Sequence, residues 1–192
     1  MADAPVTSLD VARYILRKVG PMTTMKLQKL VYYAQAWSLA WDDRPLFQDP
    51  IEAWENGPVV RSLFDRHRGQ RWIRDLGPGP EPVLDALPRE TIEGVVERYG
   101  ALSPEVLSEL THAEDPWRNA RRQGGAAPII PQEAIQLYYR GVLMDVLAEG
   151  RSEPADDAEG HLFWLKTLLS QVDPATRHAE WDTGAARGRE VW

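Results

Sequence analysis

Apolar residues recur at intervals of three and four along most of this chain, which is the spacing of α-helices that bury one face. The first run begins after Thr7, which forms a capping-box pattern with Asp10, and it stops at Gly20-Pro21. We therefore predict a helix over residues 8–19.

The second run predicts a long helix whose N-cap is Thr23 or Thr24. One apolar face of this helix is formed by Leu27, Leu30, Val31, Ala34, Trp37 and Trp41. Apolar helix stripes are usually buried, so these side chains are expected in the core. Lys26 and Lys29 fall outside the stripe, and both ammonium groups are therefore expected to lie in solvent.

A connector rich in Trp, Gly and Pro follows the long helix. Pro50 fits poorly inside a helix, so residues 46–55 are expected to form a short extended passage. Pro58 suits the first position of the next helix, because its missing N–H costs nothing there. We predict a rigid corner in which Trp54 fills space and Gly57 permits the bend.

The remainder of the body also shows helical spacing. Ser103-Pro104 and Asp115-Pro116 are typical helix starts, and Pro131-Gln132-Glu133 opens a further helix. The stretch 69–88 is rich in proline and glycine, so an irregular connection is expected there.

The composition changes at Gly150, where a polar, acidic stretch predicts a linker. A short amphipathic helix is expected over 161–172, followed by an extended tail. The predicted fold class is all-α, with a minor β element near residues 46–55 left open. The chain is predicted to comprise a compact multi-helix domain over 1–149 and a C-terminal extension over 150–192.

Composition narrows the classes of function. The 192 residues carry a formal charge of -7, which opposes a general nucleic-acid binder because such binding depends on cationic side chains. The absence of cysteine excludes disulfides, thiolate metal sites and cysteine nucleophiles. No apolar run approaches the ~20 residues that span a membrane. No secretory signal is visible, so a cytoplasmic protein without membrane contact is expected.

Candidate catalytic groups are sparse. His112 lies close to Glu114 and Asp115, but these residues surround a predicted helix boundary at which Asp115 is better explained as the N-cap. Ser103 also occupies a capping position and has no evident base. We predict no catalytic residue, no metal site and no cofactor, and therefore not an enzyme.

A helix-turn-helix that reads DNA is an alternative for the first two helices, with Lys26, Gln28 and Lys29 on the reading helix. The apolar and aromatic character of that helix argues against this alternative, as does the acidic chain.

Several blocks of sequence, in their order, resemble the Panacea domain, a SocA-like, phage-associated antitoxin domain first catalogued as a domain of unknown function. The blocks are KLQKLVYYAQAW, PLF, IEAWENGPVVRSLF and YGALSPEVLSELTHAEDPWRNAR. They span roughly residues 8–145. The residues of these blocks with an expected structural role are Leu27, Leu30, Tyr33, Trp37, Trp54, Gly57, Pro58 and Trp117. The resemblance implies a largely helical fold and a cognate protein toxin, neutralised by direct contact.

This chain departs from the family pattern near the corner. Glu55-Asn56 stands before Gly57 where relatives carry an aromatic residue, and Arg61 stands where proline is common. These changes lie where the choice of toxin could be set.

Two regions are the candidates for partner binding. A basic run suits an acidic toxin face, with a solvated surface or RNA contact as the alternatives; it comprises Arg61, Arg66, Arg68, Arg71 and Arg74, and the first four are the predicted contacts. Trp181 and Trp192 lie in a tail outside the resemblance, which is similar to the C-terminal segments of small antitoxins of other families. We expect these two tryptophans to anchor the tail on the toxin or on the chain's own body.

The predicted function is therefore an antitoxin that binds its toxin stoichiometrically through body and tail. The toxin is expected to be encoded beside this chain, and a homo-oligomer is left open. The alternatives are a repressor of its own operon and an adaptor that delivers the toxin to a protease.

Overall fold

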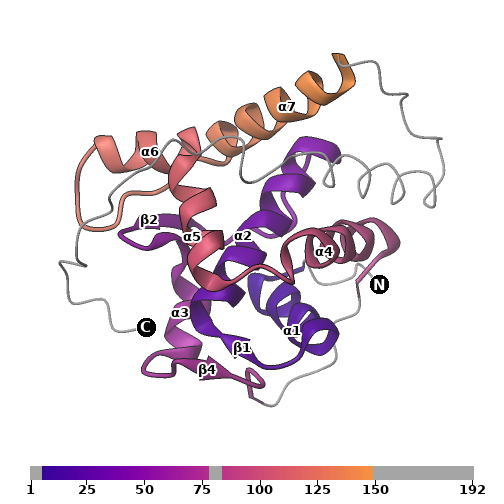
Figure 1. The fold of residues 1–192 in the computed structure, drawn as a ribbon, viewed down its shortest axis with the longest axis vertical. Coiled ribbons are helices and arrows are strands. Elements are labelled where there is room, and N and C mark those ends of the chain that lie inside the picture. Colours follow the sequence, from indigo (N-terminus) through magenta and orange to yellow (C-terminus); the bar gives the residue numbers. More distant parts are fainter. Residues whose placement is uncertain (1–5, 78–83, 149–192) are drawn as a thin grey trace.

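The computed structural model describes residues 6–77 and 84–148, which form a mostly helical body (Figure 1). The predicted all-α character is thereby confirmed. The helices are α1 (Ser8–Val19), α2 (Thr24–Trp41), α3 (Arg61–His67), α4 (Ala86–Tyr99), α5 (Pro104–Ala113), α6 (Asp115–Arg122) and α7 (Gln132–Ala148). The strands are β1 (Met22–Thr23), β2 (Ile51–Trp54), β3 (Gly57–Val60) and β4 (Trp72–Ile73), paired antiparallel as β1 with β4 and β2 with β3.

Three further parts of the sequence prediction concern the β element, residues 69–88 and the C-terminal boundary. The short β element left open near residues 46–55 is β2. The stretch 69–88 is not wholly irregular, because it contains β4 and the start of α4. The predicted boundary after residue 149 and the extension over 150–192 lie outside the described residues. None of the described helices has the length and apolar character needed to cross a membrane.

Helix α2 is the centre of the body, and α1, α4, α5 and α7 pack around it (Figure 1). Its N-cap is Thr23, whose hydroxyl accepts a hydrogen bond from the Lys26 N–H at 3.2 Å. Fifteen of its 18 residues are buried, so the burial extends well beyond the predicted apolar stripe and includes polar side chains. Such side chains need partners inside the protein.

Two of those polar side chains hold the outer edge of β3. Gln28 accepts from the Val60 N–H at 2.9 Å and donates to the Val60 carbonyl at 3.3 Å. Lys29 Nζ donates to the Pro58 carbonyl at 3.2 Å. Both side chains are 0% exposed, so the prediction that Lys29 lies in solvent is wrong. Lys26, on the turn before them, is half-buried.

The predicted helix start at Pro58 is also wrong. Pro58 lies in β3, opposite Ala53 of β2, and the next helix begins only at Arg61. A proline is tolerated in a strand whose outer edge has no ladder to complete. Here that edge faces Lys29 of α2, which donates to the Pro58 carbonyl. No hydrogen bond from the Pro58 nitrogen is needed.

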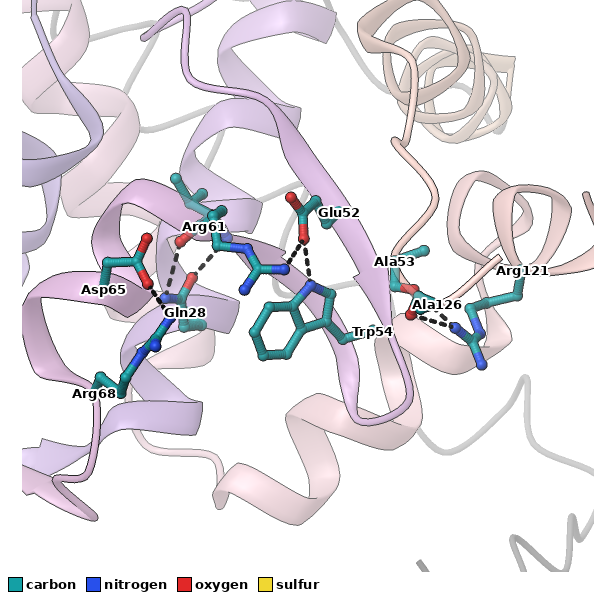
Figure 2. Close-up of polar contacts among 10 residues, drawn as sticks. Gln28, Glu52, Ala53, Trp54, Arg61, Asp65, Arg68, Arg121 and Ala126 are labelled. Atoms are coloured by element: carbon teal, nitrogen blue, oxygen red, sulfur yellow. Dashed lines mark hydrogen bonds and ion pairs between the residues drawn. The ribbon is translucent and has the colours of Figure 1, made fainter. Parts of the chain in front are cut away.

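The other edge of the hairpin formed by β2 and β3 is covered by the chain before α7. The Ala53 N–H donates to the Pro128 carbonyl at 2.7 Å, and the Ile130 N–H donates to the Ile51 carbonyl at 2.8 Å. Arg121 of α6 adds a hydrogen bond of 3.1 Å from Nη1 to the Ala53 carbonyl, as Figure 2 shows. The hairpin is therefore fixed on both edges.

Gly57 is the residue at which α2, β3 and α5 meet. Its φ of +104° lies in the left-handed region, and a Cβ placed on it would come within 2.7 Å of Lys29 Nζ and of Thr111 Oγ1. We expect Gly57→Ala to reduce the free energy of unfolding by about 3 kcal/mol or more, because backbone strain and overpacking add. Urea unfolding followed by circular dichroism measures this loss.

Gly125→Ala is the matched control, because Gly125 has a φ of +98° with nothing within 4 Å of the added Cβ. This substitution should reduce the free energy of unfolding only by the cost of backbone strain, about 1–2 kcal/mol. Equal losses in the two variants would show that Lys29 and Thr111 do not constrain Gly57.

Candidate partner-binding surface

Arginine and aromatic side chains meet where the hairpin joins α3. The rings of Trp54 and Phe64 pack edge to face, with centroids 4.7 Å apart. The Arg61 guanidinium lies 4.6 Å from the Trp54 ring centroid, and that of Arg68 lies 5.6 Å from the Phe64 centroid. We call these four residues the arginine-aromatic cluster. Cations over ring faces are attracted by the ring quadrupole, so each arginine is held in place.

The cluster follows from local chain geometry. Helix α3 begins directly after β3, so Arg61 leaves the strand beside the Trp54 ring, as Figure 2 shows. Phe64 lies three residues later and Arg68 four residues after that, which places them along one side of the helix. The position of β3 therefore determines the position of this cluster.

Carboxylates partly neutralise the two arginines of the cluster. Glu52 Oε2 accepts a hydrogen bond from Trp54 Nε1 at 2.6 Å and lies 3.3 Å from Arg61 Nη2 (Figure 2). Arg68 Nη2 lies 2.6 Å from Asp65 Oδ1. Such ion pairs at a surface contribute little to stability, about 0–1 kcal/mol, but here they also fix the direction of each guanidinium.

The other arginines of the predicted basic run are less constrained. Arg66 is the penultimate residue of α3, Arg71 precedes β4 and Arg74 follows it, and all three are exposed. Within the described part of the chain none of these side chains forms a hydrogen bond or an ion pair. The charge of Arg71 nevertheless contributes to lowering the pKa of Glu105. The structure therefore divides the predicted set: Arg61 and Arg68 are held over rings, whereas Arg66 and Arg71 extend into solvent.

Eight of the remaining predicted residues lie in the body, and two lie outside the described residues. Leu27, Leu30, Tyr33 and Trp37 are buried in α2, and Trp54, Gly57 and Pro58 are buried in the hairpin. Trp117 is half-buried in α6 and donates a hydrogen bond to the Trp54 carbonyl at 3.0 Å. Trp181 and Trp192 lie outside the described residues.

Sequence reasoning missed Trp72. Its side chain is 62% exposed, whereas Trp37 and Trp54 are 1% and 6% exposed. Alternation along a strand could have identified it, because buried Ile73 directs its neighbours Trp72 and Arg74 to the opposite, solvent-facing side. That signal was hidden by the glycines and prolines around β4.

A buried carboxyl group is the main candidate for acid-base chemistry. Glu114 accepts hydrogen bonds from the hydroxyls of Tyr32 at 2.8 Å, Tyr33 at 3.1 Å and Tyr139 at 2.8 Å. Burial raises the pKa of Glu114 to about 7, although the three hydroxyls and Lys29 oppose the shift. All four side chains are buried, so this group joins α2 and α7 to the start of α6 and is closed to a substrate.

The residues around Glu114 do not form a metal site. His112 stacks on Trp117 with ring centroids 4.1 Å apart, and burial lowers the pKa of His112 to about 4. Asp115 is the first residue of α6 and not its N-cap, because Glu114 occupies that position and directs its carboxylate into the core. Over residues 6–77 and 84–148, no group of three or more His, Cys, Asp or Glu side chains could hold a metal ion.

The structure also bears on the helix-turn-helix alternative. The would-be reading helix is α2, and its residues Gln28 and Lys29 contact β3 inside the body. A helix that is buried on nearly all sides cannot enter a DNA groove.

The fold and this surface define a mostly helical protein whose exposed arginine and aromatic groups suit contact with another macromolecule. The family model described as "Antitoxin SocA-like, Panacea domain" matches residues 27–118. "Antitoxin SocA" from Caulobacter vibrioides (strain NA1000 / CB15N) is 32% identical over 130 residues, which cover 58% of this chain and 69% of that protein. The chain belongs to the SocA-like Panacea antitoxin family. No solved structure matches it.

The match runs from the first turn of α2 to the middle of α6, and it includes the hairpin and the arginine-aromatic cluster. The eight residues to which the sequence analysis gave a structural role in the family blocks all lie in this interval, from Leu27 to Trp117. The family resemblance is therefore confirmed.

The buried Glu114 carboxyl predicts a pH-dependent stability. Its folded pKa is about 7 against the usual 4.5, so between these values the folded state holds a proton that the unfolded state has lost. Stability from this group therefore falls as the pH rises through that window. We expect the unfolding free energy of Glu114→Gln, relative to wild type, to rise by on the order of 2 kcal/mol between about pH 5 and pH 8.

Urea unfolding at a series of pH values measures this difference. The amide keeps an acceptor for the tyrosine hydroxyls, so the variant retains the local geometry. Glu109→Gln, which removes an exposed carboxylate of α5, should not reproduce the pH dependence. A flat difference for Glu114→Gln would show that Glu114 ionises as readily in the folded as in the unfolded state.

Proposed function

We propose that this chain neutralises a cognate protein toxin by direct, stoichiometric binding. Membership of the SocA-like Panacea antitoxin family carries the proposal, because it supplies the antitoxin role in general. The chemistry of the surface supports the finer statement. Neutralisation by contact requires a presented surface and no reaction, and Glu114, the buried acid among the described residues, is closed to a substrate.

The basic run after β3 is the proposed toxin contact. Residues 61–74 hold five arginines and a single carboxylate, Asp65, in a chain whose net charge is -7. Arg66 and Arg71 extend from this segment into solvent. An acidic face on the toxin would pair with them, and Arg61 and Arg68 would add guanidinium groups that are already oriented by rings and carboxylates.

The C-terminal tail is the proposed second contact. Trp181 and Trp192 would supply aromatic anchors on a segment that covers additional toxin surface. Linking the two contacts in one chain raises the effective concentration of the second after the first has formed. The tail would therefore strengthen binding without adding to the stability of the body.

The two alternatives make different demands on the structure. Operator binding through the first two helices is disfavoured by the burial of α2. An adaptor that delivers the toxin to a protease would use the same toxin contact, so it extends this proposal and does not compete with it.

Co-expression with the protein encoded by the neighbouring reading frame tests the proposal. Cells that this protein poisons should resume growth, and the two chains should co-purify at a fixed ratio. The double variant Arg66→Glu/Arg71→Glu should raise the Kd at least about 10-fold, because it places like charges against an acidic face. Isothermal titration calorimetry of the purified pair measures the change.

The control is Arg89→Glu/Arg122→Glu, which reverses two exposed arginines on α4 and α6. It should leave binding unchanged. A wild-type chain that neither protects nor co-purifies would contradict neutralisation by binding. Protection by Arg66→Glu/Arg71→Glu at the wild-type level would contradict only the assignment of the surface.

The tail gives a separate prediction. In the full chain, Trp181→Ala/Trp192→Ala should raise the Kd for the same protein at least about 10-fold, because two aromatic anchors are lost. The melting temperature without partner should not change. A lower melting temperature would show instead that the tail docks on its own body, and an unchanged Kd would remove the tail from the interface.

A further inference from the structure

Trp72 is the exposed tryptophan among the five in the described part of the chain. Its side chain is 62% exposed, and within that part of the chain it has no hydrogen-bond, ring or cation partner. Burial of such a ring is favourable in proportion to the apolar surface that it removes from water, and tryptophan carries more of that surface than any other side chain. Because the Trp72 indole is exposed, this gain is still available from a contact outside the described residues.

The backbone beneath Trp72 is held in place. In the pairing of β4 with β1, Ile73 lies opposite Met22 and Trp72 opposite Thr23. The Thr24 N–H donates to the Arg71 carbonyl at 3.1 Å, and the Thr24 hydroxyl donates to the Gln70 carbonyl at 3.3 Å. Ile73 is 1% exposed and fixes the other face of the strand in the core. A rigid backbone that presents a side chain with two torsions loses little entropy on binding.

The charges around Trp72 define the chemistry of its partner. Arg71 precedes it directly, Arg74 follows two residues later, and Arg66 lies near the end of the preceding helix; none of these three side chains forms an ion pair within the described residues. The nearest carboxylate in sequence, Asp75, accepts a hydrogen bond from the Gly77 N–H at 2.9 Å. Tryptophan and arginine are the residue types most enriched among residues that dominate binding energy.

We propose that Trp72 is the anchor of the toxin contact and inserts into an apolar pocket on an acidic face of the partner protein. The inference rests on the proposed function and adds to it the residue that contributes most affinity. The arginines position the acidic rim, while the indole fills the pocket and is desolvated. In Figure 1, β4 lies beyond α3, at the end of the body opposite α7, so this contact leaves α7 uncovered.

A nucleic acid is the other class of partner that could stack on an indole between arginines. The observations favour protein. Stacking platforms use several aromatic side chains for successive bases, whereas Trp72 is the one largely exposed aromatic residue in the described part of the chain, and the chain as a whole is acidic.

The test uses the full chain and the purified protein encoded by the neighbouring reading frame. Trp72→Thr keeps a strand-forming residue and removes the indole, and it should raise the Kd about 30-fold or more. Trp72→Phe should retain most of the affinity. Leu137→Thr is the matched control, since Leu137 is 76% exposed on α7, and its Kd should equal that of the wild type.

Hydroxyl-radical footprinting of the wild-type complex gives a readout that does not depend on any variant folding. Oxidation of Trp72 should fall when the partner is added. A 20-nucleotide polyuridylate serves as the probe for the nucleic-acid alternative, and it should neither bind nor protect Trp72.

The outcomes separate this inference from the proposed function. If the wild type binds and protects cells while Trp72→Thr binds equally well and Trp72 stays reactive, the anchor is overturned and the antitoxin proposal stands. If the wild type does not bind the neighbouring protein, both fall. Protection of Trp72 by polyuridylate but not by the protein would assign the surface to nucleic acid.

Discussion

The fold depends on the hydrogen bonds by which α2 completes the edge of β3. Gln28 pairs with both polar groups of the Val60 backbone, and Lys29 donates to the Pro58 carbonyl, all within the buried interior. An unsatisfied buried polar group costs about 1–3 kcal/mol, so these two side chains act as the missing third strand of the hairpin. They also explain Gly57, because a Cβ at that position would meet Lys29. One helix turn thereby determines where the hairpin lies.

The position of the hairpin in turn determines the surface. Because α3 follows β3 without a loop, Arg61 is placed over the Trp54 ring and the helix axis is fixed from its first residue. The buried Lys29 therefore holds the same hairpin that orders Trp54 and Arg61 at the surface. The carboxyl group of Glu114, by contrast, lies inside the body and accepts hydrogen bonds from three tyrosines. The charged side chains that are exposed on α3 and beside β4 include Arg66, Arg71 and Arg74.

Local signals in the sequence were sufficient for the ends of α1 and the start of α2, but not for the hairpin or the starts of α3 and α6. The ends of α1 follow from Thr7, Asp10 and Gly20, whose effects act within one turn, so they could be predicted. Lys29 and Pro58 could not, because each acquires its role from a residue 29 positions away in the chain. Trp72 was missed for a related reason. Its exposure is set by the pairing of β4 with β1, across 49 positions, and nothing near Trp72 specifies that partner.

Net charge was a poor guide to what this surface can bind. The figure of -7 belongs to the whole chain, while a partner in contact feels charges within a Debye length, about 8 Å at physiological ionic strength. Beside β4 the sequence places Arg71 and Arg74 together with one carboxylate, Asp75, and Arg66 and Arg68 lie at the end of the preceding helix. An acidic protein would therefore be repelled weakly at a distance and attracted near β4. In the proposed contact such a field would favour a single orientation of docking, with the arginines setting the register and the indole supplying affinity.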